Sequence, residues 1–247
     1  QAHMYEHSDE RFHFVQCNRC GLVYLNPRVE PENLGAYYPS YYLPYRGPSA
    51  WGKYAPLAER GLGITDRRRV RVTRKALRDS VASRNAVVSG DDERPPHVLD
   101  VGCGKPSFLA ALRDKWSGRM HTGADRLRLT GIDFVNSGWI DEPEHWKGIH
   151  LIESEPAAYS PEPHAGPDVI TMWHYLEHDY APRETLTRMR DISHKDTRLI
   201  IEVPHLDSIS RHRYGADWQG WHAPRHTALY NQATLAALLE ATGWQMY

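Results

Sequence analysis

The sequence is poor in cysteine, has no long hydrophobic run, and carries no excess of either charge. Three cysteines are too few for a disulfide framework, which favours a reducing compartment. No apolar run approaches the length that spans a bilayer, and the polar N-terminal stretch is not typical of a secretory signal. The 30 basic and 31 acidic side chains nearly cancel, so nothing global favours a nucleic acid or a membrane as partner. We expect a cytoplasmic protein with a small-molecule partner, and the oligomeric state stays open.

Aromatic and imidazole side chains, in contrast, are abundant. The chain holds 8 Trp, 14 Tyr and 15 His in 247 residues. Many of them lie in residues 37–54 and 212–230, which we interpret as surfaces that contact another molecule. The length suffices for one sizeable α/β domain with a small appendage.

The pattern along the chain predicts two parts. Residues 1–60 lack a long periodic pattern and are rich in Pro and Tyr, which indicates a small N-terminal extension of turns and short helices. From Thr65 the pattern becomes helical, with Asp66 as the expected N-cap. We interpret the basic residues of this helix as a solvated face, with a phosphate or nucleic-acid patch as the alternative. Residues 61–247 form the predicted main domain.

Strand and helix signals alternate through this domain. Strands are expected at PHVLDVG, RLTGIDF, GIHLIES, DVITMW and RLIIEVP, and helices at PSFLAALRDKW, RETLTRMRDIS and NQATLAALLEATG. Such alternation implies a mostly parallel sheet that is covered on both faces, which is a doubly wound α/β fold.

The loop after the first of these strands is the main candidate for a ligand site. Ligands of open α/β sheets bind beyond the carboxyl ends of the strands. Gly102 and Gly104 let the backbone approach a ligand, and Asp133, at the end of the second strand, suits a ribose diol. A dinucleotide site has a third glycine where this chain has Ser107, and Asp100 before the glycines favours a ligand with a cationic amino group.

Three segments resemble motifs of class I S-adenosylmethionine-dependent methyltransferases. They are VLDVGCG, GIDF and DVITMWHYLEH, in the order of that family. The C-terminal stretch with APRHTALY and the N-terminal CNRCGLVYLNP resemble a subfamily that has a cysteine motif and a Pro-Arg-His segment. The resemblance covers nearly the whole chain and implies a Rossmann-like methyltransferase sheet, S-adenosylmethionine as cofactor, and a sugar, lipid or specialised metabolite as acceptor.

Two features depart from that family. The final strand pair is absent, since the sequence stops at Tyr247, and we expect either a truncated chain or a sheet edge completed otherwise. The N-terminal module lacks an earlier C-x-x-C, so Cys17 and Cys20 make only half of a tetrahedral zinc site. His3, His7 or His13 could complete it. A structural zinc is therefore possible on this pattern, and a turn without metal is the alternative.

Other candidate residues follow from position and from the resemblance. Trp173 and His174 end a strand beside the glycine loop in the usual sheet order, although Trp173 could also be a core residue. Cys103 is interpreted as a small residue of the loop, because methyl transfer needs no covalent intermediate. The donor site is expected to hold Asp100, Gly102, Cys103, Gly104, Asp133, Glu155 and Trp173.

The segment from Pro204 to Tyr230 has no clear periodicity, which in a compact domain is typical of a functional loop. We expect it to form a lid or acceptor wall, with acceptor contacts from Tyr214, Trp218, Trp221 and Arg225. Imidazoles suit proton removal, so O- or C-methylation is favoured. The expected catalytic residues are His222 and His226, followed by His174 and His178. The alternatives are an NAD-dependent oxidoreductase and a methyltransferase-like module without catalysis.

Overall fold

The computed structural model describes residues 10–38, 48–87, 94–116, 127–135, 138–161 and 166–247. The strands are β1 (Phe14–Gln16), β2 (Val23–Leu25), β3 (His97–Val101), β4 (Arg128–Asp133), β5 (His150–Glu153), β6 (Val169–Trp173), β7 (Arg198–Glu202) and β8 (Ala228–Leu229). The α-helices are α2 (Ala55–Val87), α3 (Ser107–Lys115), α4 (Pro182–Asp191), α5 (Ile209–Tyr214) and α6 (Gln232–Ala241). Short 3₁₀ helices are η2 (Pro31–Tyr37), η3 (Pro48–Tyr54), η4 (Pro156–Ala158), η5 (Gly215–Asp217) and η6 (Gln219–Trp221).

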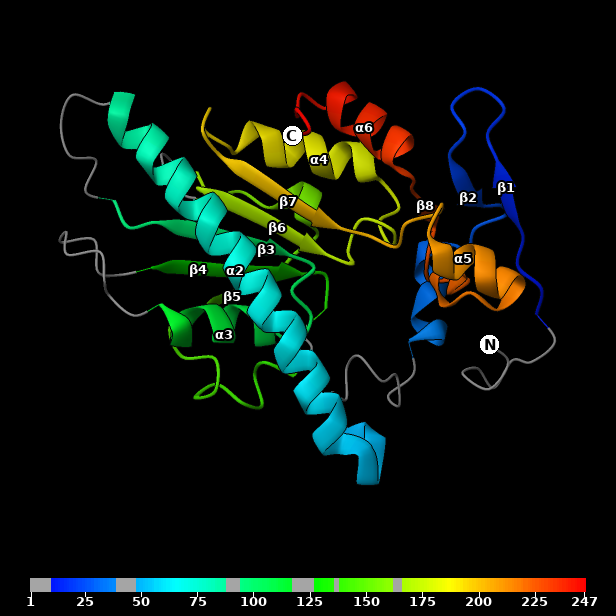
Figure 1. Cartoon of the computed structure of the whole chain (residues 1–247), viewed down its shortest axis with the longest axis horizontal. Coiled ribbons are helices and arrows are strands. Elements are labelled where there is room, and N and C mark those ends of the chain that lie inside the picture. The colour runs from blue at the N-terminus through cyan, green and yellow to red at the C-terminus, as the bar shows by residue number, and fades with distance from the viewer. Residues whose placement is uncertain (1–9, 39–47, 88–93, 117–126, 136–137, 162–165) are drawn as a thin grey trace. The chain divides into compact units, whose positions relative to one another are not determined.

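Five strands form the main sheet, in the order β5-β4-β3-β6-β7 (Figure 1). The central strand β3 pairs in parallel with both β4 and β6, and β4 pairs in parallel with β5. All five residues of β3 are buried, as expected for a parallel sheet with both faces covered. The predicted α/β, Rossmann-like fold class and the predicted strands and helices of the main domain are confirmed.

The chain divides into two compact units, each of which is made of segments that are separate in the sequence. The central unit comprises Ser40–Met172 and Arg188–Ile200, and the terminal unit comprises Gln1–Pro39, Trp173–Thr187 and Ile201–Tyr247. The expected boundary between residues 60 and 61 falls within α2, and the domain division 1–60 and 61–247 stays a prediction. After α6, residues 242–247 form no strand.

Helix α2 of the central unit begins ten residues earlier than expected. Asp66 was expected as its N-cap, and this expectation is wrong because Asp66 lies buried within the helix. Burial raises the pKa of Asp66, while Arg69 and a hydrogen bond with Ser107 of α3 oppose that shift. The packing of α2 on α3 therefore offsets the low helix propensity of the glycines in its first turns.

The two faces of α2 agree with the sequence pattern. Val70, Thr73, Leu77 and Val81, which recur at helical spacing in the sequence, are all buried. The arginines at positions 67, 68 and 71 are exposed, as both a solvated face and a phosphate-binding patch require, so the interpretation of the basic run as a solvated face stays a prediction.

A buried ion pair joins α2 to the start of β6. Arg84 Nη1 lies 2.7 Å from Asp168 Oδ1, and the other oxygen, Oδ2, accepts a hydrogen bond from the backbone N–H of His97 at 2.9 Å. His194 Nε2 lies 3.3 Å from Oδ1. These partners lower the pKa of Asp168 even though burial alone would raise it. The carboxylate therefore stays charged inside the protein and joins the start of β6 to α2, to β3 and to the segment at His194.

We predict that Asp168→Ala lowers the free energy of unfolding by about 3–5 kcal/mol, because it removes the carboxylate that neutralises a buried guanidinium. Because the native pKa of Asp168 is depressed, its contribution is present above the unfolded pKa and is lost as pH falls through the folded value. Urea unfolding at several pH values measures both effects. Asp191→Ala, at an exposed carboxylate of the same unit, is the control and should change stability by less than about 0.5 kcal/mol. Equal effects of the two variants would contradict the prediction.

The terminal unit contains a second, antiparallel sheet in the order β1-β2-β8. Its small core consists of Leu206, Trp218 and Leu229, against which Phe14, Val23 and Trp221 pack. The segment from Pro204 to Tyr230, which the sequence led us to interpret as a loop, contains the regular elements α5, η5, η6 and β8. Elements this short bury too few residues to give a periodic sequence pattern, so the tertiary core stabilises them. The role of the segment as a lid or acceptor wall stays a prediction.

Candidate functional site

The glycine loop follows β3 in the central unit. Gly102 and Gly104 have φ values of 71° and 48°, a region that side chains other than glycine rarely adopt. The N–H groups of Gly102 and Cys103 both donate to the carbonyl of Ile132, at 2.8 and 3.1 Å, which ties the loop to the end of β4. A Cβ atom on Gly104 would meet no atom within 4 Å. The loop thus leaves open space at Gly104 into which a ligand can come close to the backbone.

Two carboxylates lie at the neighbouring strand ends. Asp133, the last residue of β4, is buried and accepts a hydrogen bond from the Gly104 N–H at 2.8 Å through Oδ2. Burial raises the pKa of Asp133, the backbone N–H groups oppose the shift, and the negative charge of Glu155 adds to it. Glu155 is exposed and follows β5. The glycine loop is therefore bordered by acidic groups.

A third carboxylate lies beneath the loop. Asp100 is only 3% exposed, and its Oδ1 accepts a hydrogen bond from the Thr171 hydroxyl of β6 at 2.6 Å. Burial raises the pKa of Asp100 to about 7, although the bond from Thr171 opposes the shift. Thr171 was missed in the sequence, since only the register of β3 against β6 brings it opposite Asp100. Trp139 was missed as well; its Nε1–H donates to the Gly104 carbonyl at 2.7 Å.

Cys103 packs inward from the loop. A Cβ atom on Gly131 of β4 would lie 2.8 Å from Cys103 Sγ and 3.0 Å from Leu109 Cδ1 of α3. Burial raises the pKa of the Cys103 thiol, so that it remains protonated. These contacts agree with the interpretation of Cys103 as a small residue accommodated in the loop.

We predict that Asp100 makes stability depend on pH. Between the usual carboxyl pKa of 3.8 and the folded value of about 7, the native state holds a proton that the unfolded state has released. The free energy of unfolding therefore falls as pH rises through this window, by at most about 1.4 kcal/mol per pH unit from this group. Asp100→Asn, which keeps an oxygen for the Thr171 hydroxyl, should remove that slope. Urea unfolding of both proteins between pH 4 and pH 8 tests this, and parallel stability curves would contradict it.

The predicted catalytic histidines lie together in the terminal unit. His174, which has a φ of 55°, contacts two carboxylates: Nδ1 lies 3.1 Å from Glu177 Oε1 and Nε2 lies 3.3 Å from Glu202 Oε1. Hydrogen bonds to Glu177 and then Glu202 raise the pKa of His174 to about 9. At neutral pH this imidazole already holds its proton, so it is unsuited to act as a base.

The histidine cluster consists of His178, His222 and His226. The ring of His226 lies 4.6 Å from that of His178 and 4.8 Å from that of His222, measured between centroids. Arg225 Nη1 donates to His222 Nε2 at 2.6 Å, which leaves the His222 proton on Nδ1, 3.3 Å from His226 Nε2. Arg225 Nε also donates to the carbonyl of Tyr37 at 2.6 Å.

The environment of the histidine cluster keeps its imidazoles neutral. Burial and the neighbouring His226 and Arg225 lower the pKa of His222 to about 3. The pKa values of His178 and His226 are also lowered, in both cases chiefly by burial. The cluster thus consists of neutral rings, in which Arg225 Nη1–H and His222 Nδ1–H donate to the lone pairs of His222 and His226, whereas His174 beside it is a cation.

The expected acceptor-binding residues have different surroundings within the terminal unit. Tyr214 is 56% exposed, whereas Trp218 is buried in the core and its Nε1–H donates to Ser210 Oγ at 3.1 Å. Trp221 packs against that core, and its Nε1–H donates to the Gly215 carbonyl. The buried guanidinium of Arg225 lies 5.3 Å from the centre of the Tyr38 ring. Trp173 is half-buried at the end of β6.

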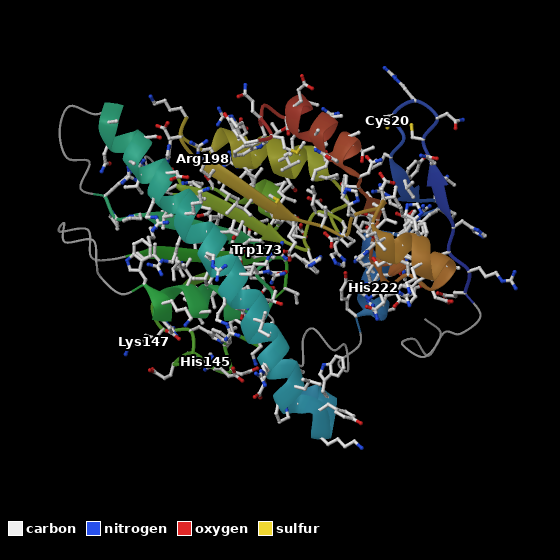
Figure 2. All side chains as sticks on the ribbon, in the orientation of Figure 1. Cys20, His145, Lys147, Trp173, Arg198 and His222 are labelled. Atoms are coloured by element: carbon white, nitrogen blue, oxygen red, sulfur yellow. The ribbon has the colours of Figure 1, made fainter. Side chains whose placement is uncertain are left out.

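The cysteine pair lies on the β1–β2 hairpin, and Figure 2 shows Cys20 away from His222. Both Cys17 and Cys20 are free thiols, and backbone hydrogen bonds from the turn lower the pKa of Cys17. Among the described residues neither belongs to a group of three or more metal-ligand side chains. His3 and His7 lie outside the described residues, so the zinc site on Cys17 and Cys20 stays a prediction.

Residues 71–247 match the family model described as "Methyltransferase domain". The chain belongs to this methyltransferase-domain family. The match includes the whole glycine loop, His174 and the histidine cluster of this methyltransferase. No curated protein matches the chain.

Several solved structures resemble the methyltransferase. One is 1,6-didemethyltoxoflavin-N1-methyltransferase of Burkholderia thailandensis, with bound 1,6-didemethyltoxoflavin and S-adenosylhomocysteine: 19% identity over 96% of this chain and 89% of that chain, TM-score 0.48. Another is LepI in complex with SAM, at 18% identity over 68% of this chain and 42% of that chain, TM-score 0.49. Within the described residues, no helix of the methyltransferase has the length and apolar character to cross a membrane.

Proposed function

We propose that this methyltransferase transfers the methyl group of S-adenosylmethionine to a small-molecule acceptor, such as a sugar, a lipid or a specialised metabolite. The observation that carries the proposal is the open glycine loop beside Asp133. Gly104 leaves room for close approach, and the Asp133 carboxylate at the strand end suits the two hydroxyls of a ribose.

The charge around the loop favours this donor over a dinucleotide. Asp100, Asp133 and Glu155 border or underlie the loop, and the nearby Lys105 lies 3.5 Å from Glu142. Acidic surroundings disfavour a pyrophosphate and suit the sulfonium and ammonium groups of S-adenosylmethionine. The residues therefore fit the cofactor, and we propose Asp100, Gly102, Cys103, Gly104, Asp133, Glu155 and Trp173 as its site.

The bound donor would supply an electrophilic methyl group, so the protein's task is to position the acceptor and remove its proton. We propose Tyr214, Trp218, Trp221 and Arg225 for acceptor binding, with the exposed Tyr214 as a direct contact and the buried Trp218 and Arg225 as residues that hold the segment in place. We propose a neutral ring of the histidine cluster, His222 or His226, as proton acceptor. A proton acceptor at this position favours an acidic O–H or C–H acceptor over a neutral amine, because an amine depends less on proton removal before methyl transfer.

We predict that Gly104→Val abolishes detectable binding of S-adenosylmethionine in calorimetry, because the new side chain fills the open space at the loop. A positive φ also strains the variant, so the control must share that strain. Gly52→Val provides it: Gly52 has a φ of 52° and equally open surroundings but lies in η3. It should bind the donor as the wild type does. Unchanged affinity in a folded Gly104→Val variant, or binding of NAD in place of S-adenosylmethionine by the wild type, would contradict the proposed function.

We predict that His222→Ala and His226→Ala each lower kcat by about 10²- to 10⁴-fold with donor affinity preserved. The acceptor is first identified by mass spectrometry in a lysate supplied with labelled donor. Because the pKa values of both histidines are lowered, the wild-type rate should stay constant as pH falls through the usual histidine range and decline only below it. His205→Ala, at an exposed histidine of the same unit, is the control. Wild-type kcat in both cluster variants would exclude them as proton acceptors.

A further inference from the structure

We propose that Glu177, His178 and His226 together bind a divalent transition-metal ion, for which zinc is the probe. One carboxylate oxygen of Glu177 and one ring nitrogen of each histidine lie within 4.8 Å of one another. All three residues belong to the terminal unit, and none is part of the cysteine pair. The site is therefore distinct from the zinc site expected on the β1–β2 hairpin and from the donor loop.

Glu177 has a carboxylate oxygen that requires a partner. Its side chain is only 1% exposed, and Oε1 is occupied by His174 Nδ1 at 3.1 Å. Oε2 is buried and has no hydrogen-bond partner. A buried carboxylate oxygen without a donor or cation is unfavourable, so this position favours a bound cation or a water held by one.

Both histidines have the hydrogen bonds that are typical of metal ligands. His178 Nδ1 lies 3.1 Å from the Arg225 carbonyl and 3.3 Å from the Tyr38 hydroxyl, which can also accept, and His226 Nδ1 lies 2.8 Å from the Gly220 carbonyl. Because a carbonyl only accepts, each Nδ1 carries the proton and each Nε2 carries the lone pair. A backbone carbonyl on the far nitrogen fixes the tautomer and the orientation of a metal-binding imidazole. Both rings are therefore oriented and neutral, as metal binding requires.

Two further buried polar groups without partners lie near Glu177. The hydroxyl of Tyr230 is buried and has no hydrogen-bond partner, and neither has Asp179 Oδ2. Burial raises the pKa of Tyr230, and the charges of Asp179 and Glu177 raise it further, which indicates that these groups lie close together. Groups of this kind commonly hold ordered water, and here they could hydrogen-bond to water on a metal ion.

The ligand types indicate the class of ion. Two imidazoles and one carboxylate suit zinc and other first-row divalent metals and suit magnesium or calcium poorly. Metal–ligand bonds of about 2.0–2.2 Å would draw the ligand atoms together by about 1 Å, and His222 Nδ1–H would have to release His226 Nε2. The Arg225 guanidinium and the His174 cation oppose the ion, and the Glu177 and Asp179 carboxylates attract it.

A metal ion at Glu177, His178 and His226 would change the roles of the rings in the histidine cluster. An ion there would occupy the lone pairs of His178 and His226. The proton acceptor would then be an oxygen on the ion, or His222 once Arg225 Nη1 has released its Nε2. Three protein ligands leave room for such an oxygen, as in other sites of this composition.

The test is titration of the metal-stripped full-length chain with zinc in a calorimeter. We expect this site to bind one equivalent of zinc independently of the cysteine pair, and Glu177→Gln and His178→Ala to weaken that affinity by at least about tenfold each. Glu202→Gln is the matched control, because it removes the other carboxylate on His174 without touching the proposed ligands; it should bind zinc like the wild type. Circular dichroism and thermal unfolding show whether each variant is folded, and two independent ligand variants keep the test valid if one is not.

A second variant and a second ion show whether the bound metal lies at the proposed site or at the cysteine pair. The Cys17→Ser/Cys20→Ser double variant should still bind one equivalent of zinc. Cobalt bound at the proposed site should show no thiolate charge-transfer absorption, because no cysteine is among the ligands. Wild-type affinity in folded Glu177→Gln and His178→Ala, or loss of the equivalent in the cysteine variant, would overturn the proposal. Calorimetry with S-adenosylmethionine on the metal-stripped protein reports the donor site separately, so failure of the metal site and failure of the proposed function are distinguishable.

Discussion

The register of β3 against its two neighbours is the constraint on which the donor loop depends. It sets Asp100 opposite Gly131 on β4 and opposite Thr171 on β6. The missing side chain at Gly131 makes room for Cys103 and for Leu109 of α3, and the Thr171 hydroxyl supplies the hydrogen bond beneath the loop. A shift of one residue would turn every side chain of β3 to the other face of the sheet. The positions of the loop, of α3 and of the Asp133 carboxylate all follow from this one alignment.

Burial has opposite outcomes for carboxylates within the central unit. Asp168 stays ionised because Arg84, His194 and a backbone N–H offset the loss of water around it. Asp100 has one hydroxyl donor and other carboxylates nearby, so its pKa rises to about 7. The difference fits a division of tasks. The satisfied carboxylate stabilises the fold, whereas an incompletely satisfied one near a loop gains most from a cationic ligand.

The histidines of the terminal unit show the same contrast. His174 and His178 are four residues apart, yet the first is cationic between Glu177 and Glu202 and the second is neutral. Neutral rings whose far nitrogens are held by backbone carbonyls can donate the lone pair of the other nitrogen, either to a metal ion or to a proton that leaves the acceptor. A metal ion at Glu177, His178 and His226 would satisfy the one carboxylate oxygen that His174 leaves without a partner.

The sequence alone determined the order of strands and helices, the glycine loop and the acidic residue that ends β4, because these depend on local periodicity and on glycine's backbone freedom. It misjudged Asp66 and the segment from Pro204 to Tyr230, whose structure depends on contacts with distant residues. Only the tertiary structure decided that Thr171 and Trp139 support the loop, that Trp218 packs in a core, and that His178 and His226 gather around Glu177. Strand register, burial and protonation arise from neighbours far apart along the chain, and no local pattern records them.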